Sequence, residues 1–313
     1  MAHMSNPIAE PGHLHIRNSR TSEPSDILDI IYYHTQCLTQ VAGMLLELPQ
    51  SVTAQANVLL GRFWLSVSPM AHEFSDVSAA ALYIVTKMGS HPRPPRDLSN
   101  VYGYLLSPKT RLFPADDTPR ERDPASYYQH EDEYLAFHNR ILALEPQILY
   151  ALSFDTHVSL PHPLTITYLQ TLDFLGQPKE VIGRKTIEYL NTALLSPQML
   201  YLTHQPHSLA TAAIYNAAKD LGSKTPESAW WEVFDVDREE LGFLVVGMRS
   251  LETWAKAQRG DNPALFGEHM VTRKLVREEI ARRGLAAANG GLSKAGDEED
   301  ELMRQLDQRS DDT

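Results

Sequence analysis

Two stretches of small apolar residues constrain the fold of this chain more than any other feature. Residues 77–85 are apolar at nearly every position, and alanine fills five of the ten positions in 209–218. A helix without a polar face has to lie inside a bundle of other helices. The segments beside both stretches repeat their apolar residues at three- and four-residue spacing, and no period-two alternation runs beyond four residues. The sequence therefore predicts an all-α protein.

Clusters of helix-breaking residues divide the chain into two blocks of about five helices, each with an alanine-rich third helix at its centre. In the first block we expect helices at residues 26–48, 52–66, 75–88, 95–106 and 126–152. In the second block we expect them at 163–175, 178–195, 206–221, 227–234 and 237–258. The 313 residues also suffice for two domains. We therefore predict two similar helical domains, 26–155 and 160–258, with flexible extensions at both ends.

The two extensions differ in composition. Residues 1–25 are polar and hold several prolines, so we expect a disordered lead-in, whose first four residues resemble a remnant of an expression vector. In the C-terminal extension, 259–313, residues 271–283 carry five basic and two acidic side chains and form a basic helical segment. Residues 297–312 carry eight acids and two arginines, which is half of the net charge of −12 and typical of a disordered tail.

An apolar stripe on the basic segment has two interpretations. Leu275, Val276 and Ile280 fall on one helical face, which could dock on a third subunit of an assembly. The same segment could equally be a solvated helix, and the sequence leaves both interpretations open.

Charge and composition exclude several classes of protein. With 28 Lys+Arg against 40 Asp+Glu, the chain offers no basic face for phosphates, so no direct nucleic-acid contact is expected. The single cysteine, Cys37, excludes a disulfide framework and a cysteine-rich zinc site. The longest apolar runs, such as 79–85, are far shorter than a membrane-spanning helix, and no signal peptide is visible. No membrane partner is therefore expected.

No recognisable catalytic pattern is present either. The run at 183–186 resembles a phosphate-binding loop only superficially, because Pro178 and Arg184 stand where that motif needs glycine and lysine. The histidines and acids at 130–138 fit the charged start of a helix, and the tryptophan pair 230–231 fits packing better than a ligand platform. We therefore expect no catalytic residue, no metal site and no cofactor.

Several motifs, in order along the chain, resemble those of the cyclin family. In the first block they are the run at 48–63 with its Arg-Phe ending, the alanine-rich run at 77–87 that ends in lysine, and the runs at 92–98 and 145–155. The runs at 41–50, 162–170 and 207–218, with Trp230, Trp231 and Phe234, are most similar to the L-type cyclins of the transcriptional branch. K-, T- and H-type cyclins are near competitors. The resemblance implies two tandem five-helix cyclin boxes.

The resemblance also implies a function. A cyclin is a regulatory subunit, not an enzyme, that binds and activates a cyclin-dependent protein kinase; this branch acts in the nucleus, in RNA polymerase II transcription and pre-mRNA processing. The family's kinase contact centres on a lysine–glutamate pair, which maps onto Lys87 and Glu145. The apolar kinase-binding positions around this pair map onto Ile84, Met88, Leu149 and Phe154.

Three departures from the family pattern keep an alternative open. Gly89 and Ser90 stand where family members often carry two acids, and no substrate-docking motif of the cell-cycle cyclins is found around 30–41. The acidic tail replaces the Arg/Ser-rich tail of animal L-type cyclins. The alternative is a cyclin-fold scaffold in a transcription or RNA-processing assembly that activates no kinase. A nucleic-acid binder of the general transcription factor kind is disfavoured, because the chain outside the tail still has a net charge of −6.

Overall fold

The computed structural model describes residues 5–10, 23–107, 110, 127–172, 179–223, 226 and 228–284. Within these ranges all regular structure is helical, which confirms the predicted all-α class. The acidic run at 297–312 and the first four residues lie outside the described part of the chain.

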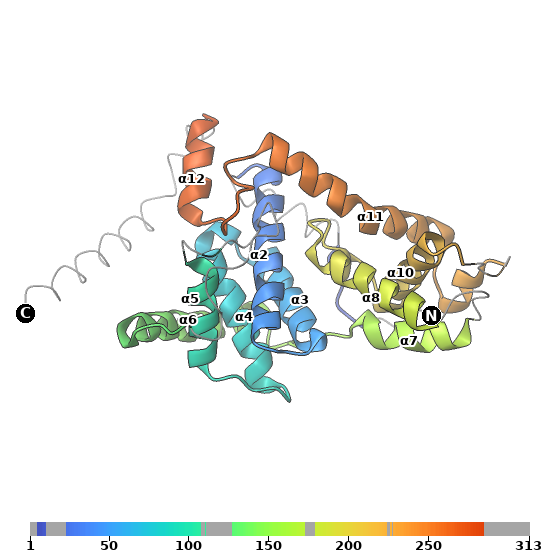
Figure 1. Ribbon diagram of the computed structural model, residues 1–313, viewed down its shortest axis with the longest axis horizontal. Coiled ribbons are helices and arrows are strands. Elements are labelled where there is room, and N and C mark those ends of the chain that lie inside the picture. The colour runs from blue at the N-terminus through green and yellow to red at the C-terminus, as the bar shows by residue number, and fades with distance from the viewer. Residues whose placement is uncertain are drawn as a thin grey trace, which may run out of the picture.

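In its described residues the first block has five α-helices, one of which lies at the centre of the other four. These are α2 (Ser25–Leu45), α3 (Gln50–Ser66), α4 (Phe74–Met88), α5 (Pro95–Leu106) and α6 (Glu131–Ala151). Helix α4 packs against the other four (Figure 1). Its three consecutive alanines, 79–81, are fully buried, and their small side chains let the neighbouring helices come close. The prediction that this helix is buried is therefore confirmed up to its last turn, where the chain emerges into solvent.

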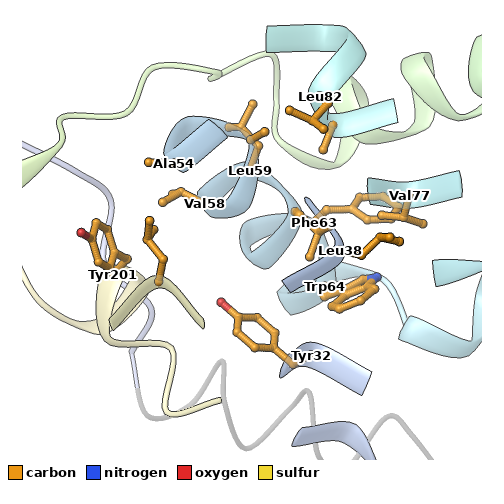
Figure 2. Close-up of a cluster of buried hydrophobic side chains, with 14 of the residues drawn as sticks. Tyr32, Leu38, Ala54, Val58, Leu59, Phe63, Trp64, Val77, Leu82 and Tyr201 are labelled. Atoms are coloured by element: carbon orange, nitrogen blue, oxygen red, sulfur yellow. The ribbon is translucent and has the colours of Figure 1, made fainter. Parts of the chain in front are cut away.

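Large side chains from α2, α3 and α4 fill the space around these alanines. Figure 2 shows Leu38, Leu59, Phe63, Trp64, Val77 and Leu82 converging in this core. Tyr201, which comes from the second block, belongs to the same cluster. The hydrophobic core is therefore continuous from one block into the other.

The second block is less regular than the first. Its elements are α7 (Pro161–Thr171), α8 (Lys179–Leu195), α9 (Leu200–Thr203), α10 (Pro206–Asp220), the 3-10 helix η3 (Trp230–Phe234) and α11 (Arg238–Asp261). The alanine-rich α10 lies at the centre and packs against α7, α8, α9, α11 and η3. Sequence periodicity missed the single turn of α9, and it predicted an α-helix at 227–234 where η3 forms. Five residues are too few to show helical periodicity clearly.

Residues 5–10 correct one prediction. They were expected to belong to a disordered lead-in, yet Asn6 and Ala9 are buried against the second block. The backbone N–H of Ala9 donates to the carbonyl of Leu202 at 2.7 Å. The polar composition misled the prediction because this segment is held mainly by hydrogen bonds, which leave no hydrophobic pattern in a sequence. Residues 11–22 lie outside the described part of the chain.

The chain returns to the first block after α11. We call residues 262–284 the C-terminal strap; it includes α12 (Arg273–Arg282). Its buried apolar side chains are Leu265, Phe266, Met270, Val271 and Val276. The ring of Phe266 stacks on Tyr33 of α2 with centroids 5.5 Å apart. The helix expected at 271–283 is confirmed as α12, whereas the expectation of a flexible extension is wrong for residues 262–284.

The apolar stripe of α12 faces the chain's own core. Val276 is fully buried, and Leu275 and Ile280 pack partly buried against the same cluster. A third subunit therefore cannot use Val276, since the first block already covers it. The sequence had left two interpretations open, docking on another chain or a solvated helix. The structure shows a third arrangement, in which the helix docks on its own chain.

Ion pairs fasten both ends of α12 to the first block. Arg273 pairs with Glu73 at 3.2 Å, and Arg283 pairs with Asp26 at 2.8 Å. Glu279 is buried and accepts hydrogen bonds from Arg282 and Arg283. Those bonds, with that of Arg282 the strongest, lower the pKa of Glu279 to about 2. The strap is thus held by both apolar burial and paired charge.

Candidate functional site

Lys87 and Glu145 meet on the surface of the first block. The Nζ atom of Lys87 lies 2.8 Å from Oε1 of Glu145, although the residues are 58 positions apart in the sequence. Lys87 occupies the last turn of α4, where that buried helix emerges into solvent, and Glu145 lies on the crossing helix α6. The Lys87 side chain stays 50% exposed and that of Glu145 is 15% exposed. The two residues that the resemblance singled out are therefore in direct contact.

The ion pair contributes little to the fold. The hydrogen bond from Lys87 to Glu145 raises the pKa of the lysine, and the ring of Tyr83 lies 5.3 Å from its Nζ atom. A pair this exposed stabilises a fold by about 0–1 kcal/mol, because water screens the charges. What the pair does is to fix the direction of one positive and one negative group on an otherwise open surface.

Two of the four apolar candidates are exposed. Met88 ends α4 and is 54% exposed, while Phe154 follows α6 and is 61% exposed. Leu149 is partly buried on the same stretch of α6. Side chains of this size cost free energy when they face water, and exposed large apolar side chains are typical of a surface that a partner covers.

Ile84 does not belong to the exposed surface. It is 1% exposed and is part of the core, because α4 is surrounded by other helices up to its last turn. The prediction of Ile84 as a kinase-contacting residue is corrected accordingly: its side chain supports the surface from below and is not accessible to a partner.

An unusual turn presents Phe154. Ser153 and Phe154 both have positive φ angles, 51° and 61°, which residues other than glycine rarely adopt. Such a conformation costs on the order of 1 kcal/mol for each residue. Two hydrogen bonds hold the turn, from Ser153 N to Tyr150 O at 3.0 Å and from Phe154 N to Leu149 O at 2.8 Å. The turn ends α6 and leaves the Phe154 ring in solvent.

Sequence reasoning missed Tyr150. Its side chain is 71% exposed, and its ring packs edge-on against that of Phe154 with centroids 5.3 Å apart. The available signal was the spacing of four residues between two aromatic side chains at the end of a helix. Tyr150 and Phe154 together form an exposed aromatic pair at the C-terminal end of α6.

The loop after Lys87 carries no acid. Gly89 and Ser90 are exposed, and the Ser90 hydroxyl lies 2.9 Å from Nδ1 of His91. The negative charge that the resemblance leads one to expect here is therefore absent, and Glu145 supplies the acidic group next to Lys87.

Other candidate sites do not form in the described residues. These residues hold no group of three or more His, Cys, Asp and Glu that could bind a metal ion. Among them there is also no helix long and apolar enough to cross a membrane. Residues 183–186 lie within α8, and His130 and Glu133 form a capping box at the start of α6. Trp230 is buried in the core of the second block.

Comparison of the sequence with those of known proteins shows the family of this chain. No family model matches the chain. An uncharacterised cyclin-L1-like protein of Schizosaccharomyces pombe is 33% identical over 205 residues, which cover 66% of this chain and 76% of the relative. The chain belongs to the cyclin family. Chicken cyclin-L1 is 30% identical over 260 residues, covering 83% of this chain and 44% of the relative, and mouse cyclin-L2 is 31% identical over 261 residues, covering 82% and 47%.

These relatives place the chain among the L-type cyclins, and the resemblance read from the sequence is confirmed. The cyclin spans about half the length of the vertebrate relatives it matches. The relatives are cyclins, which are regulatory subunits of kinases rather than enzymes themselves.

Solved structures confirm the cyclin-box fold. A chain of the yeast RNA Pol II CTD kinase CTDK-1 complex aligns with a TM-score of 0.61 at 13% identity, covering 92% of this chain and 94% of that one. A chain of the CAK complex of Chaetomium thermophilum bound to ATP-gamma-S aligns with a TM-score of 0.52 at 18% identity, covering 90% and 87%.

Proposed function

We propose that this cyclin binds and activates a cyclin-dependent kinase through the surface around the Lys87–Glu145 pair. The observation that carries the proposal is that pair, 2.8 Å apart between α4 and α6, together with the exposure of Met88 at the end of α4 and of Phe154 just after α6. We call the residues Lys87, Met88, Glu145, Leu149, Tyr150 and Phe154 the kinase-facing surface.

The chemistry of this surface fits a protein partner. Interfaces gain most of their binding energy from a few large side chains that become fully desolvated, and charged groups at their centre fix orientation. Phe154 and Met88 supply the large side chains that a partner would desolvate, and the Lys87–Glu145 pair supplies the charged groups that fix orientation. A kinase is activated when its own lysine–glutamate pair and its magnesium-binding aspartate are both in place. A cyclin that binds that conformation preferentially shifts the kinase population toward it.

The proposal extends to where the complex acts. The proposed place of action is the nucleus, in RNA polymerase II transcription and pre-mRNA processing, with no membrane partner and no direct nucleic-acid contact. We also propose that residues 271–283 contact a third subunit, through the outward charged face of α12 that includes Lys274 and Arg277. The apolar face of the helix is not available, because Val276 is buried in the core.

The test is recovery of a kinase from cells that express the cyclin, using Lys87→Glu, Glu145→Lys and the double variant. The single changes place like charges together, and the double variant restores an ion pair of reversed direction. We expect all three to lose most of the recovered kinase activity while the circular dichroism spectrum stays helical. The matched control is Lys256→Glu with Glu252→Lys, an exposed pair on α11 at 2.7 Å.

Two results would refute parts of this proposal. Equal kinase recovery from the Lys87 and Glu145 variants would show that the surface is wrongly assigned. Recovery of no kinase by the unchanged cyclin would remove the activating role altogether.

The second result would favour the alternative, a cyclin-fold scaffold without kinase activation. The exposed Gly89 and Ser90, which leave the loop after Lys87 without an acid, are the observation that favours it. A scaffold would recover transcription or RNA-processing proteins and no phosphotransfer activity.

A further inference from the structure

The short N-terminal segment of residues 5–10 is bound in a specific way. It passes between the two groups of helices, near the start of α7 (Figure 1). The side-chain amide of Asn6 forms two bonds with the backbone of Ser159: Nδ2 donates to the Ser159 carbonyl and Oδ1 accepts from the Ser159 N–H, both at 2.8 Å. One side chain thus satisfies both backbone groups of a residue 153 positions away.

A second amide binds the segment from the other side. Oε1 of Gln205 accepts from the backbone N–H groups of Ser5 and Asn6 at 3.1 and 3.2 Å. Its Nε2 donates to the Asn6 carbonyl at 2.9 Å. Asn6 and Gln205 are both buried, and a buried amide costs free energy unless its donors and acceptors are satisfied. Gln205 therefore requires a backbone in this position.

The segment is also suited to be a ligand. Pro7 restricts Asn6 before it to extended conformations, in which the backbone groups of Asn6 are free to bind the Gln205 amide. Proline has no N–H, so its exposed position loses no donor. Further along, Ala9 is buried and donates to the carbonyl of Leu202.

The bound segment holds the connection between the two cyclin boxes. Ser159 lies in that connection, which α3 grips from the other side: Gln55 donates to the Thr156 carbonyl at 2.8 Å and Arg62 donates to the His157 carbonyl at 2.9 Å. Gln205 belongs to the second box. One short segment therefore bridges the connection and the second box, while α3 anchors the connection to the first.

We propose that the joint of the two boxes carries a peptide-binding site, formed by the Ser159 backbone, the Leu202 carbonyl and the Gln205 amide. Its ligand is an extended peptide with asparagine followed by proline, and residues 5–10 of the same chain occupy it as a clip that fixes the connection. This inference does not rest on the proposed kinase contact.

Hydrogen–deuterium exchange on the full chain tests the clip. Asn6→Ala and Gln205→Ala each remove at least two hydrogen bonds, so exchange at residues 5–10 and 156–160 accelerates by roughly tenfold or more. Exchange in the double variant is faster than in either single variant, but by much less than the product of the two single accelerations. The two effects are not independent, because both substitutions release the same segment. The matched control, Asn139→Ala at an exposed position of α6, leaves these rates unchanged. Unchanged rates in both single variants would overturn the proposal.

A labelled peptide of residues 5–10 tests the site directly. By fluorescence anisotropy it binds full-length Asn6→Ala, whose own segment is loosened, and binds the unchanged chain at least tenfold more weakly because the clip competes at high local concentration. Adding Gln205→Ala to Asn6→Ala abolishes binding. Equal binding with and without Gln205 would refute the site. If the unchanged chain is a dimer that Asn6→Ala dissociates, the segment acts between copies, which would overturn the assignment within one chain.

Discussion

Replacing Phe266 by alanine tests whether the C-terminal strap is part of the folded unit. Phe266 is 3% exposed and sits among aromatic rings. Its centroid lies 5.5 Å from that of Tyr33, 4.9 Å from that of His34 and 6.2 Å from that of Trp254. The Arg259 guanidinium carbon lies 5.6 Å from the same centroid. The substitution therefore removes a large side chain that contacts α2 and α11 at once.

The expected loss is about 3–5 kcal/mol of the free energy of unfolding, the usual cost of truncating a buried phenylalanine. For a chain of this size this corresponds to a fall in Tm of roughly 10 °C. Phe266→Leu retains most of the volume and is expected to cost only about 1–1.5 kcal/mol. The matched control is Val233→Ala, an exposed change expected to stay within about 0.5 kcal/mol.

Urea denaturation followed by circular dichroism measures the free energy, and hydrogen exchange at residues 265–276 shows where the structure opens. If Phe266→Ala costs less than about 1 kcal/mol and exchange in the strap does not accelerate, the strap is not held by this ring and the reasoning fails.

Two further predictions concern backbone strain and pH. Ser153→Gly relieves a left-handed residue and is expected to raise the free energy of unfolding by about 0.5–1 kcal/mol; a lower urea midpoint would contradict this. Burial, with the nearby charge of Arg259, lowers the pKa of His34 from 6.5 to about 3. The unfolded chain therefore takes up this proton first, and stability that is fully present above pH 6.5 is lost as pH falls toward 3, by up to about 1.4 kcal/mol per pH unit. The same urea titrations on His34→Phe should show a shallower fall between pH 6.5 and 5, and an unchanged slope would contradict the assignment.

Much of the first box could be predicted from the sequence because its helices bury continuous apolar patterns. The alanine run of α4 predicted a buried central helix, and the expected bounds 75–88 and 95–106 differ from α4 and α5 by at most one residue. Such patterns say that a face is buried but not against what. The stripe of Leu275, Val276 and Ile280 was visible in the sequence, whereas its target in the first box was not.

The candidate site was likewise only partly predictable from the sequence. Periodicity alone gives no reason to pair Lys87 with Glu145, 58 residues apart, and only the family resemblance brought them together. The clip was missed for a related reason. Asn6 and Gln205 are polar residues 199 positions apart whose partners are backbone atoms, and backbone atoms carry no sequence signal. Ile84 was misassigned because a motif gives the position of a residue and not the direction of its side chain.

The C-terminal strap also determines when the first box can complete its folding during translation. The ion pair between Asp26 and Arg283 joins residues 257 positions apart, so a ribosome adding about 5–20 residues per second needs roughly 13–50 s to travel between them. During that time the first box has emerged while the face that Phe266 and Val276 will cover is still open to water. An apolar face open for so long is a binding site for chaperones and a risk for aggregation. The apolar face of the first box is therefore covered only once α12 has been synthesised and has packed against it.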